Sequence, residues 1–322
     1  MIDALDSIAL FKKLLSIESP PGSERSRGEA VARLFEDKAF EMSFDPLGNL
    51  IARKRGSGRK VMICARLDSA GVIAKHVDKD GCVHVMPLGN LNTQQLLGSR
   101  VRFENGLSGI LVPAENDIPG ELIVDLGSPE AVMPVGCKAV FSGEAIYQGD
   151  LVMGPSCGSV ATCVAALLAV KILRDVGGDI SFVFAAQGEI EQRGVKAAAY
   201  ALSPELGILL DVSESPRGSA AGRVKLGQGP AVIMRDQSAI YPKEVSNVIE
   251  LCANRLQTPI QREVREMDGG ETAGGHLLSR GIMIGAIGIP VKYRLSANEI
   301  VNIRDVESAA KILATTLLDL AT

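Results

Sequence analysis

The segment VMICARLD, residues 61–68, ends in side chains that could do chemistry. Its apolar first half predicts a buried strand, and Asp68 stands where that strand ends. The ends of strands are where α/β enzymes place their reactive and binding groups. Two residues before the acid, Arg66 brings a permanent positive charge to the same strand end. The chemistry expected there depends on what this guanidinium does.

Histidine and cysteine limit the chemistry further. The chain has three histidines, so a mechanism with several imidazole ligands must draw on His76, His84 and His276. The first two alternate in strand-like runs and are expected at a surface or interface. Cys157 begins a predicted helix, a location that lowers a thiol pKa. It could act as a nucleophile with His276 as its base, but buried packing is the favoured interpretation. The six cysteines form no CxxC pair, which indicates reduced thiols.

The composition describes an ordinary soluble protein. The 322 residues are 46% hydrophobic and 22% charged, with a net charge of −4. The length allows two domains. The absence of a basic patch argues against a nucleic-acid partner. No apolar run reaches the ~18 residues of a membrane span, and the N-terminal segment MIDALDSIALFKKLL is acidic and unlike a signal peptide. A cytoplasmic location is expected.

Apolar periodicity predicts an α/β domain that a second domain interrupts. Buried strand patterns alternate with helical patterns in residues 1–69 and 156–322, which we expect to form one discontinuous domain. Between them, residues 70–155 hold short β-like segments separated by turn signals such as KDG and ENG. This density of short strands is typical of a small β-barrel or sandwich. Expected helices cover residues 5–17, 23–38, 159–177, 193–203, 244–257, 275–281 and 303–320.

Several segments match the motifs of one family in order along the chain. Gly48-Asn49 is similar to the family's D-x-x-GN turn, RLD at 66–68 to its HxD, and QGEIEQRG at 187–194 to its QEEVGLRG. LLDV, KLGQGPAV, DGGETAG and KYRLSANEIVNIRDVE match further family segments. The chain therefore resembles the tetrahedral aminopeptidases, a group of cytosolic glutamyl and deblocking metallopeptidases. The resemblance implies a mixed-sheet zinc-aminopeptidase-like fold whose β-rich insert serves dimerisation, with dimers assembling into a hollow dodecamer.

The resemblance also implies a site with two divalent metals, zinc or cobalt, and a glutamate as general base. Transferred residue by residue, it keeps three acids of that site. Asp68 matches the acid that orients the first histidine ligand. Glu189 and Asp211 match two metal ligands. Two carboxylates alone make an insufficient site, because dedicated sites use at least three or four protein ligands.

The other positions of the implied site have lost their chemistry. The first histidine ligand falls on Arg66, and the last falls on Leu295, with Arg294 beside it. The general base falls on Gly188. The two aspartates that include the metal bridge fall on Gly158 and Ser159, and a Thr-Asp pair falls on Glu271 and Thr272. No intact catalytic residue and no bound metal are therefore expected.

Removing two cations from a pocket leaves its carboxylates repelling one another. We therefore expect Arg66, helped by Arg193 or Arg294, to form ion pairs with the three retained acids. The alternative is that these acids still bind a cation. If a peptide N-terminus enters the cleft, a carboxylate such as Glu189 or Glu271 would hold its amine.

Two functions of different classes follow. The first is a non-catalytic member of the aminopeptidase family, a pseudoenzyme that binds, regulates or assembles. Its partners would be a peptide ligand and copies of itself, or an active paralogue in a hetero-oligomer. The alternative is an active aminopeptidase or other hydrolase with an altered metal site. Metal content distinguishes the two.

Overall fold

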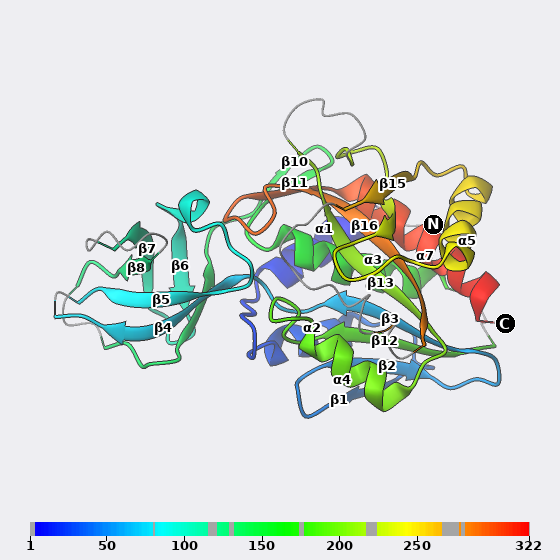
Figure 1. Ribbon diagram of the computed structural model, residues 1–322, viewed down its shortest axis with the longest axis horizontal. Helices are drawn as coiled ribbons and strands as arrows, with labels where there is room; N and C mark the ends of the chain where they lie inside the picture. The colour runs from blue at the N-terminus through cyan, green and yellow to red at the C-terminus, as the bar shows by residue number, and fades with distance from the viewer. Residues whose placement is uncertain are drawn as a thin grey trace.

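The computed structural model describes residues 4–79, 81–114, 121–128, 132–173, 177–216, 224–265, 277 and 281–321. Two bodies are visible in Figure 1: a large α/β part and a β-barrel that projects from one end of it. This is the mixed α/β fold with a barrel insert that the sequence predicts. Within the described residues, no helix is long and apolar enough to cross a membrane.

The α/β part is built on an 11-stranded mixed sheet in the order β1-β2-β12-β3-β13-β16-β17-β11-β10; in addition, β14 pairs with β16, and β15 pairs with β14. Its four central strands, β12, β3, β13 and β16, run parallel to one another. Such strands are covered on both faces and read as continuous apolar runs. The strands of the sheet are β1 Glu41–Phe44, β2 Leu50–Lys54, β3 Lys60–Arg66, β10 Ile146–Gln148, β11 Leu151–Gly154, β12 Asp179–Ala185, β13 Leu206–Glu214, β14 Ala231–Arg235, β15 Gln261–Val264, β16 Met283–Lys292 and β17 Glu299–Asn302.

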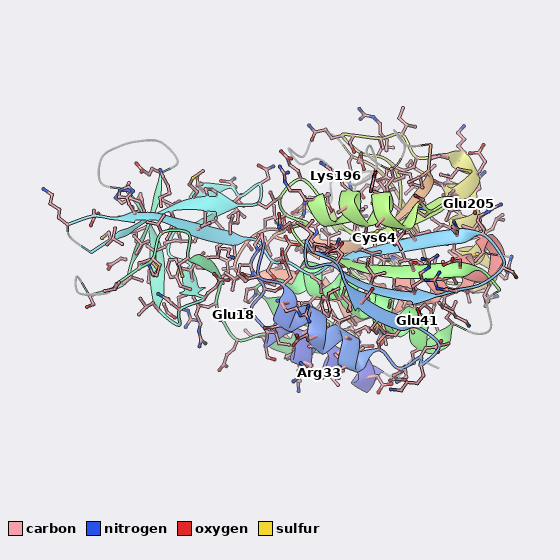
Figure 2. The ribbon with its side chains drawn as sticks, turned by 90° about the horizontal axis from the view of Figure 1, so that it is seen from below. Glu18, Arg33, Glu41, Cys64, Lys196 and Glu205 are labelled. Atoms are coloured by element: carbon pink, nitrogen blue, oxygen red, sulfur yellow. The ribbon has the colours of Figure 1, made fainter. Side chains whose placement is uncertain are left out.

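Helices cover both faces of this sheet. One face packs against α1 (Ala4–Leu15), α2 (Arg25–Leu34), α3 (Cys157–Ile172) and α7 (Ile303–Leu320), with α5 (Lys243–Arg255) beside α7. The other face packs against α4 (Arg193–Leu202). Figure 2 shows the two layers, with Lys196 of α4 on one side of the sheet and Arg33 of α2 on the other. Helix α3 is apolar almost all round, as expected of a helix enclosed by the sheet and other helices.

The insert is a closed barrel in the order β4-β5-β8-β7-β6-β9 with its own apolar core. Its strands are β4 Gly71–Val77, β5 Val83–Leu88, β6 Arg100–Phe103, β7 Ser108–Pro113, β8 Leu122–Asp125 and β9 Lys138–Phe141, and the short helix η1 covers Thr93–Leu96. His76 and His84 lie opposite each other on β4 and β5 with stacked rings. Strands β10 and β11 pair within the large sheet, since β11 joins β17. We therefore propose that the inserted unit ends near residue 142 rather than at residue 155.

The order of the parallel strands fixes where the site must be. Strands β3, β12 and β13 point the same way, so their carboxyl ends meet at one edge of the sheet. Arg66 is the last residue of β3, and Asp211 lies near the end of β13. The loop after β12, residues 186–192, passes over the same edge before α4 begins.

Asn49 fixes this loop. Its side-chain oxygen accepts a hydrogen bond from the N–H of Ala186 at 2.8 Å. Its amide nitrogen donates to the carbonyl of Gly194 at 2.9 Å and to the Asp45 carboxylate at 2.6 Å. Because Asn49 is fully buried, these backbone groups have no water as a substitute. The turn between β1 and β2 therefore sets the position of the loop that carries Gly188 and Glu189.

We predict that Asn49→Ala lowers the free energy of unfolding by about 2–4 kcal/mol, because it leaves the buried N–H of Ala186 without its partner, at about 1–3 kcal/mol, and removes a hydrogen bond to the carbonyl of Gly194, at about 0.5–1.5 kcal/mol. Urea denaturation followed by circular dichroism measures the loss. Asn254→Ala, at an exposed position of α5, is the matched control and should change stability by less than about 0.5 kcal/mol. Equal losses in the two variants would show that Asn49 does not hold the loop.

Candidate functional site: an arginine between two acids

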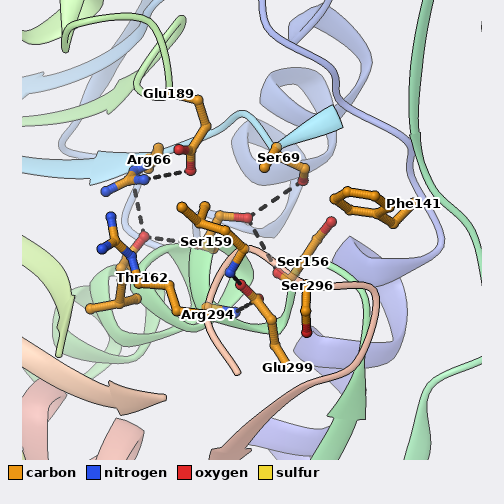
Figure 3. A pocket seen from close by; sticks show the side chains of 14 residues that line it. Arg66, Ser69, Phe141, Ser156, Ser159, Thr162, Glu189, Arg294, Ser296 and Glu299 are labelled. Carbon is orange, nitrogen blue, oxygen red and sulfur yellow. Dashed lines mark hydrogen bonds and ion pairs between the residues drawn. The ribbon is translucent and has the colours of Figure 1, made fainter. Parts of the chain in front are cut away.

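The centre of the site is the guanidinium of Arg66, which lies between two carboxylates (Figure 3 shows the pair with Glu189). Its Nη1 is 2.5 Å from Oε1 of Glu189, and its Nη2 is 2.9 Å from Oδ1 of Asp211. The three side chains are only 11%, 7% and 17% exposed. The two ion pairs that the sequence predicts for Arg66 with these acids are present. Burial alone would lower the pKa of Arg66, but the charges of the acids outweigh it and raise that pKa.

Asp68 has a different partner from the one predicted. Its Oδ1 accepts a hydrogen bond from the N–H of Gly188 at 2.8 Å, and its Oδ2 accepts one from the N–H of Glu189 at 2.7 Å. The expected ion pair with Arg66 is therefore wrong, although the guanidinium still acts on this carboxylate through space. Burial and the charge of Glu189 raise the pKa of Asp68. The role of Asp68 in the structure is to hold the loop that carries Glu189.

A second arginine, Arg265, completes the charge balance. Its Nη1 is 2.8 Å from Oδ2 of Asp211, and its Nε is 3.1 Å from Oε2 of Glu263. Asp211 thus lies between two guanidinium groups, one on each carboxylate oxygen. Burial would raise the pKa of Asp211, but Arg265 and then Arg66 outweigh it and hold that pKa well below its usual range.

The sequence analysis assigned this helper role to Arg193 or Arg294. Arg193 is 53% exposed and pairs with Glu191 at 2.9 Å, so that assignment is wrong. Arg294 lines the pocket and lowers the pKa of Asp211 through space. Arg265 was missed because it follows β15, outside every segment that resembles the family. The alternating QREVRE pattern is the signal that could have found it.

The two glycines at the site leave no room for larger side chains. A Cβ added to Gly188 would lie 2.5 Å from Cγ of Arg66 and 2.8 Å from Oδ1 of Asp68. A Cβ added to Gly158 would lie 3.2 Å from Cγ1 of Val212. A carboxylic side chain at residue 188 is therefore incompatible with the observed position of Arg66.

Leu295 and Gly158 both contact a buried acid, Glu299. Its Oε1 accepts a hydrogen bond from the N–H of Leu295 at 2.8 Å, and its Oε2 accepts one from the N–H of Gly158 at 2.7 Å. Glu299 thereby joins the first turn of α3 to the loop after β16. Burial raises its pKa to about 7. The sequence reasoning overlooked Glu299, although it lies in the family-like segment KYRLSANEIVNIRDVE.

The remaining candidates add no reactive group. Cys157 is fully buried, which confirms the favoured interpretation of buried packing. Burial raises its pKa, so the alternative of a thiol activated at a helix start is wrong. The hydroxyl of Ser159 donates to the carbonyl of Ser156 at 3.2 Å. Glu271, Thr272 and His276, together with all of the predicted helix 275–281 except Leu277 and Gly281, lie outside the described residues.

These side chains do not fit a pair of divalent metals. A guanidinium is always a donor and cannot ligate a cation. The carboxylate oxygens that face Arg66 are already bound to it. The enclosed space of the pocket is about 20 Å³, enough for about one water. Across the part of the chain that the structure describes, no group of three or more His, Cys, Asp or Glu side chains is arranged to hold a metal ion.

The fold and the positions of these residues define the class of protein. The family model of the M42 glutamyl aminopeptidases matches residues 48–117 and 121–312, and the chain belongs to this family. It is 34% identical to a "Putative aminopeptidase" of Acetivibrio thermocellus over 96% of this chain and 97% of the relative. It is 29% identical to the lysyl aminopeptidase of Pyrococcus furiosus over 96% of each.

Solved structures agree with this assignment. The aminopeptidase APDkam598 from Desulfurococcus kamchatkensis superposes with a TM-score of 0.89 and 26% identity, covering 98% of this chain and 95% of that one. The PhTET1-12s structure, described as a dodecamer, superposes with a TM-score of 0.85 and 25% identity, covering 99% of this chain and 100% of that one.

The buried acid Glu299 predicts a pH dependence of stability. Its pKa is about 7 in the folded protein and about 4.5 when unfolded, so the folded state holds a proton that the unfolded state lacks between these values. Stability must then fall as pH rises from 5 to 8. We expect Glu299→Gln to flatten this slope, which urea titrations at several pH values measure. The exposed Glu36→Gln is the control and should keep the slope; an unchanged slope in Glu299→Gln would contradict the assignment.

The close approach of Gly188 to Arg66 predicts coupling between the two positions. Gly188→Ala alone should destabilise the protein by about 1–3 kcal/mol through overpacking. In an Arg66→Ala background the same change should cost at least about 1 kcal/mol less, because most of the clash is gone. Unfolding free energies of the two single variants and the double variant give the coupling. Gly158→Ala, whose Cβ meets Val212 instead, should show no coupling to Arg66, and equal coupling for both glycines would refute the steric argument.

Proposed function

We propose that this chain is a non-catalytic member of the M42 aminopeptidase family, a pseudoenzyme that binds or assembles instead of hydrolysing peptides. The observation that carries the proposal is the guanidinium of Arg66 between Glu189 and Asp211. In the resemblance described above, these two acids are metal-ligand positions. Arg66, a cation that is part of the chain, binds one oxygen of each acid, so a divalent ion that used both acids would have to displace it.

The position of the general base supports the same conclusion. Hydrolysis by this family would need a carboxylate to take a proton from the attacking water. Its counterpart here is Gly188, where even a Cβ would collide with Arg66. Loss of the base and presence of the arginine are therefore structurally linked, which argues against a weakened but working version of the same mechanism.

Assembly is the property that the fold retains. Within the described residues, the six strands of the insert form a closed barrel. One related structure is described as a dodecamer, and a related peptidase is described as assembling into a tetrahedron or a large octahedral shell. We infer that this chain also forms a homo-oligomer, or a mixed oligomer with an active paralogue.

The test is metal content together with turnover. Protein purified without chelator and soaked in Zn²⁺, Co²⁺ or Mn²⁺ should retain far less than about one metal per chain after dialysis, since dedicated sites need three or four ligands. It should release nothing from a panel of aminoacyl chromogenic substrates. The lysyl aminopeptidase of Pyrococcus furiosus, treated identically, is the positive control. About two tightly held metals per chain with measurable turnover would establish the alternative, an active aminopeptidase with an altered metal site.

A further inference from the structure

A groove much larger than the pocket around Arg66 lies beside it. It has a volume of about 1110 Å³ and runs between the barrel and the α/β part. Arg294, Leu295 and Ser296 line both this groove and the small pocket, so the two spaces meet at these residues. The volume is enough for a ligand of several residues, because pockets for small ligands are typically about 300–1,000 Å³.

Arg294, at this junction, has one side-chain donor with no partner among the described residues. Its Nε is buried and has no acceptor. The other two arginines of the site are fully engaged, Arg66 with two acids and Arg265 with two acids and the carbonyl of Val212. Arg294 is therefore the cation of the site that has capacity for a ligand. Figure 3 shows it along the same pocket wall as Glu299, below Arg66 and Glu189.

The acids that face Arg294 do not use that capacity. The charge of Arg294 acts on Asp211 and Glu299 through space and holds the pKa of each below the value that burial alone would give. However, the oxygens of Asp211 bind the other two arginines, and those of Glu299 accept backbone N–H groups. A ligand can bind Arg294 without breaking any of these bonds.

The backbone on either side of Arg294 is held in an unusual conformation. Tyr293 and Leu295 have φ angles of 56° and 61°, the left-handed region that non-glycine residues rarely adopt. The turn is closed by the N–H of Ser296, which donates to the carbonyl of Tyr293 at 3.2 Å. Strain of this kind persists where the surrounding structure imposes it, and it is concentrated at ligand sites. Here it fixes the direction of one side chain, Arg294.

We propose that Arg294 binds a carboxylate of a peptide-sized ligand that lies in the groove. A guanidinium matches a carboxylate in charge and planar geometry. The groove wall combines apolar Ile146 and Met153 with one acid, Glu214. It also holds the side-chain amides of Asn92, Gln95 and Asn298, which can bond peptide groups. The carboxylate is either a free C-terminus or an acidic side chain. The buried end of the ligand thus carries negative charge, the opposite of a peptide amine.

This inference rests on the proposed non-catalytic function, and its test separates the two. Binding is measured by fluorescence polarisation on the full chain without added metal, using short labelled peptides of one sequence. One peptide has a free C-terminus, one is amidated, and one is amidated with glutamate as its first residue. Metal content and turnover do not enter this measurement, so a failure of the ligand proposal can be distinguished from a failure of the proposed non-catalytic function.

We expect the peptide with a free C-terminus, the glutamate peptide or both to bind more tightly than the neutral amidated peptide, with binding that weakens as salt increases. Arg294→Gln should weaken this binding by about tenfold to hundredfold, the value of a charged hydrogen bond. Arg294→Lys should recover part of the affinity because it keeps the charge.

The control is Arg255→Gln, which removes one exposed arginine from the far end of α5 and should leave binding unchanged. Unfolding curves of each variant verify that the protein is folded. Equal binding of all three peptides, no binding of any of them, or an equal effect of the two arginine-to-glutamine changes would each overturn the proposal.

Discussion

The site depends on one requirement, that the buried acids Glu189 and Asp211 be neutralised by a cation. Both are held by elements that cannot move apart, since Asp211 belongs to a central strand and the loop of Glu189 is tied to Asp68. Two carboxylates forced together in a low-dielectric site repel each other strongly. Arg66 meets the requirement from the end of β3, the strand next to β13. Removing such a partner typically costs about 3–5 kcal/mol, a large part of a domain's stability.

That choice of cation constrains its neighbours. The side chain of Arg66 fills the space at the end of β3. The loop after β12 passes close to this side chain, which leaves room only for a glycine at residue 188. The N–H groups of this loop then face Asp68, which is why that acid bonds the backbone instead of the guanidinium. The second carboxylate oxygen of Asp211, which Arg66 does not bind, forms an ion pair with Arg265. The substitutions at the site are thus one connected arrangement, not a set of independent losses.

Much of this could be predicted from the sequence, and the exceptions have physical reasons. The fold followed from strand and helix patterns plus ordered motifs, and the pairs of Arg66 followed from charge balance. Arg265 was missed because the alternating QREVRE pattern marks a strand but does not show that its arginine pairs with Asp211, 54 residues earlier in the chain. Strands β10 and β11 were assigned to the insert because alternation predicts a strand but not its partner. Buried packing of Cys157 was the favoured interpretation and is confirmed, because α3 is enclosed by the sheet and other helices, and burial therefore determines the pKa of this thiol.

A guanidinium and a metal ion both neutralise acids, but they support different chemistry. A metal ion bonds directly to water and lowers its pKa from about 15.7 to about 7, which makes hydroxide available at neutral pH. A guanidinium only donates hydrogen bonds, with N–H groups whose directions are fixed. Arg66 can therefore hold Glu189 and Asp211 in place, but it cannot make a nucleophile from water. Under the proposed non-catalytic function, the pocket does not have to admit a reacting peptide bond. The adjoining groove, which ends at Arg294, is large enough to take a ligand.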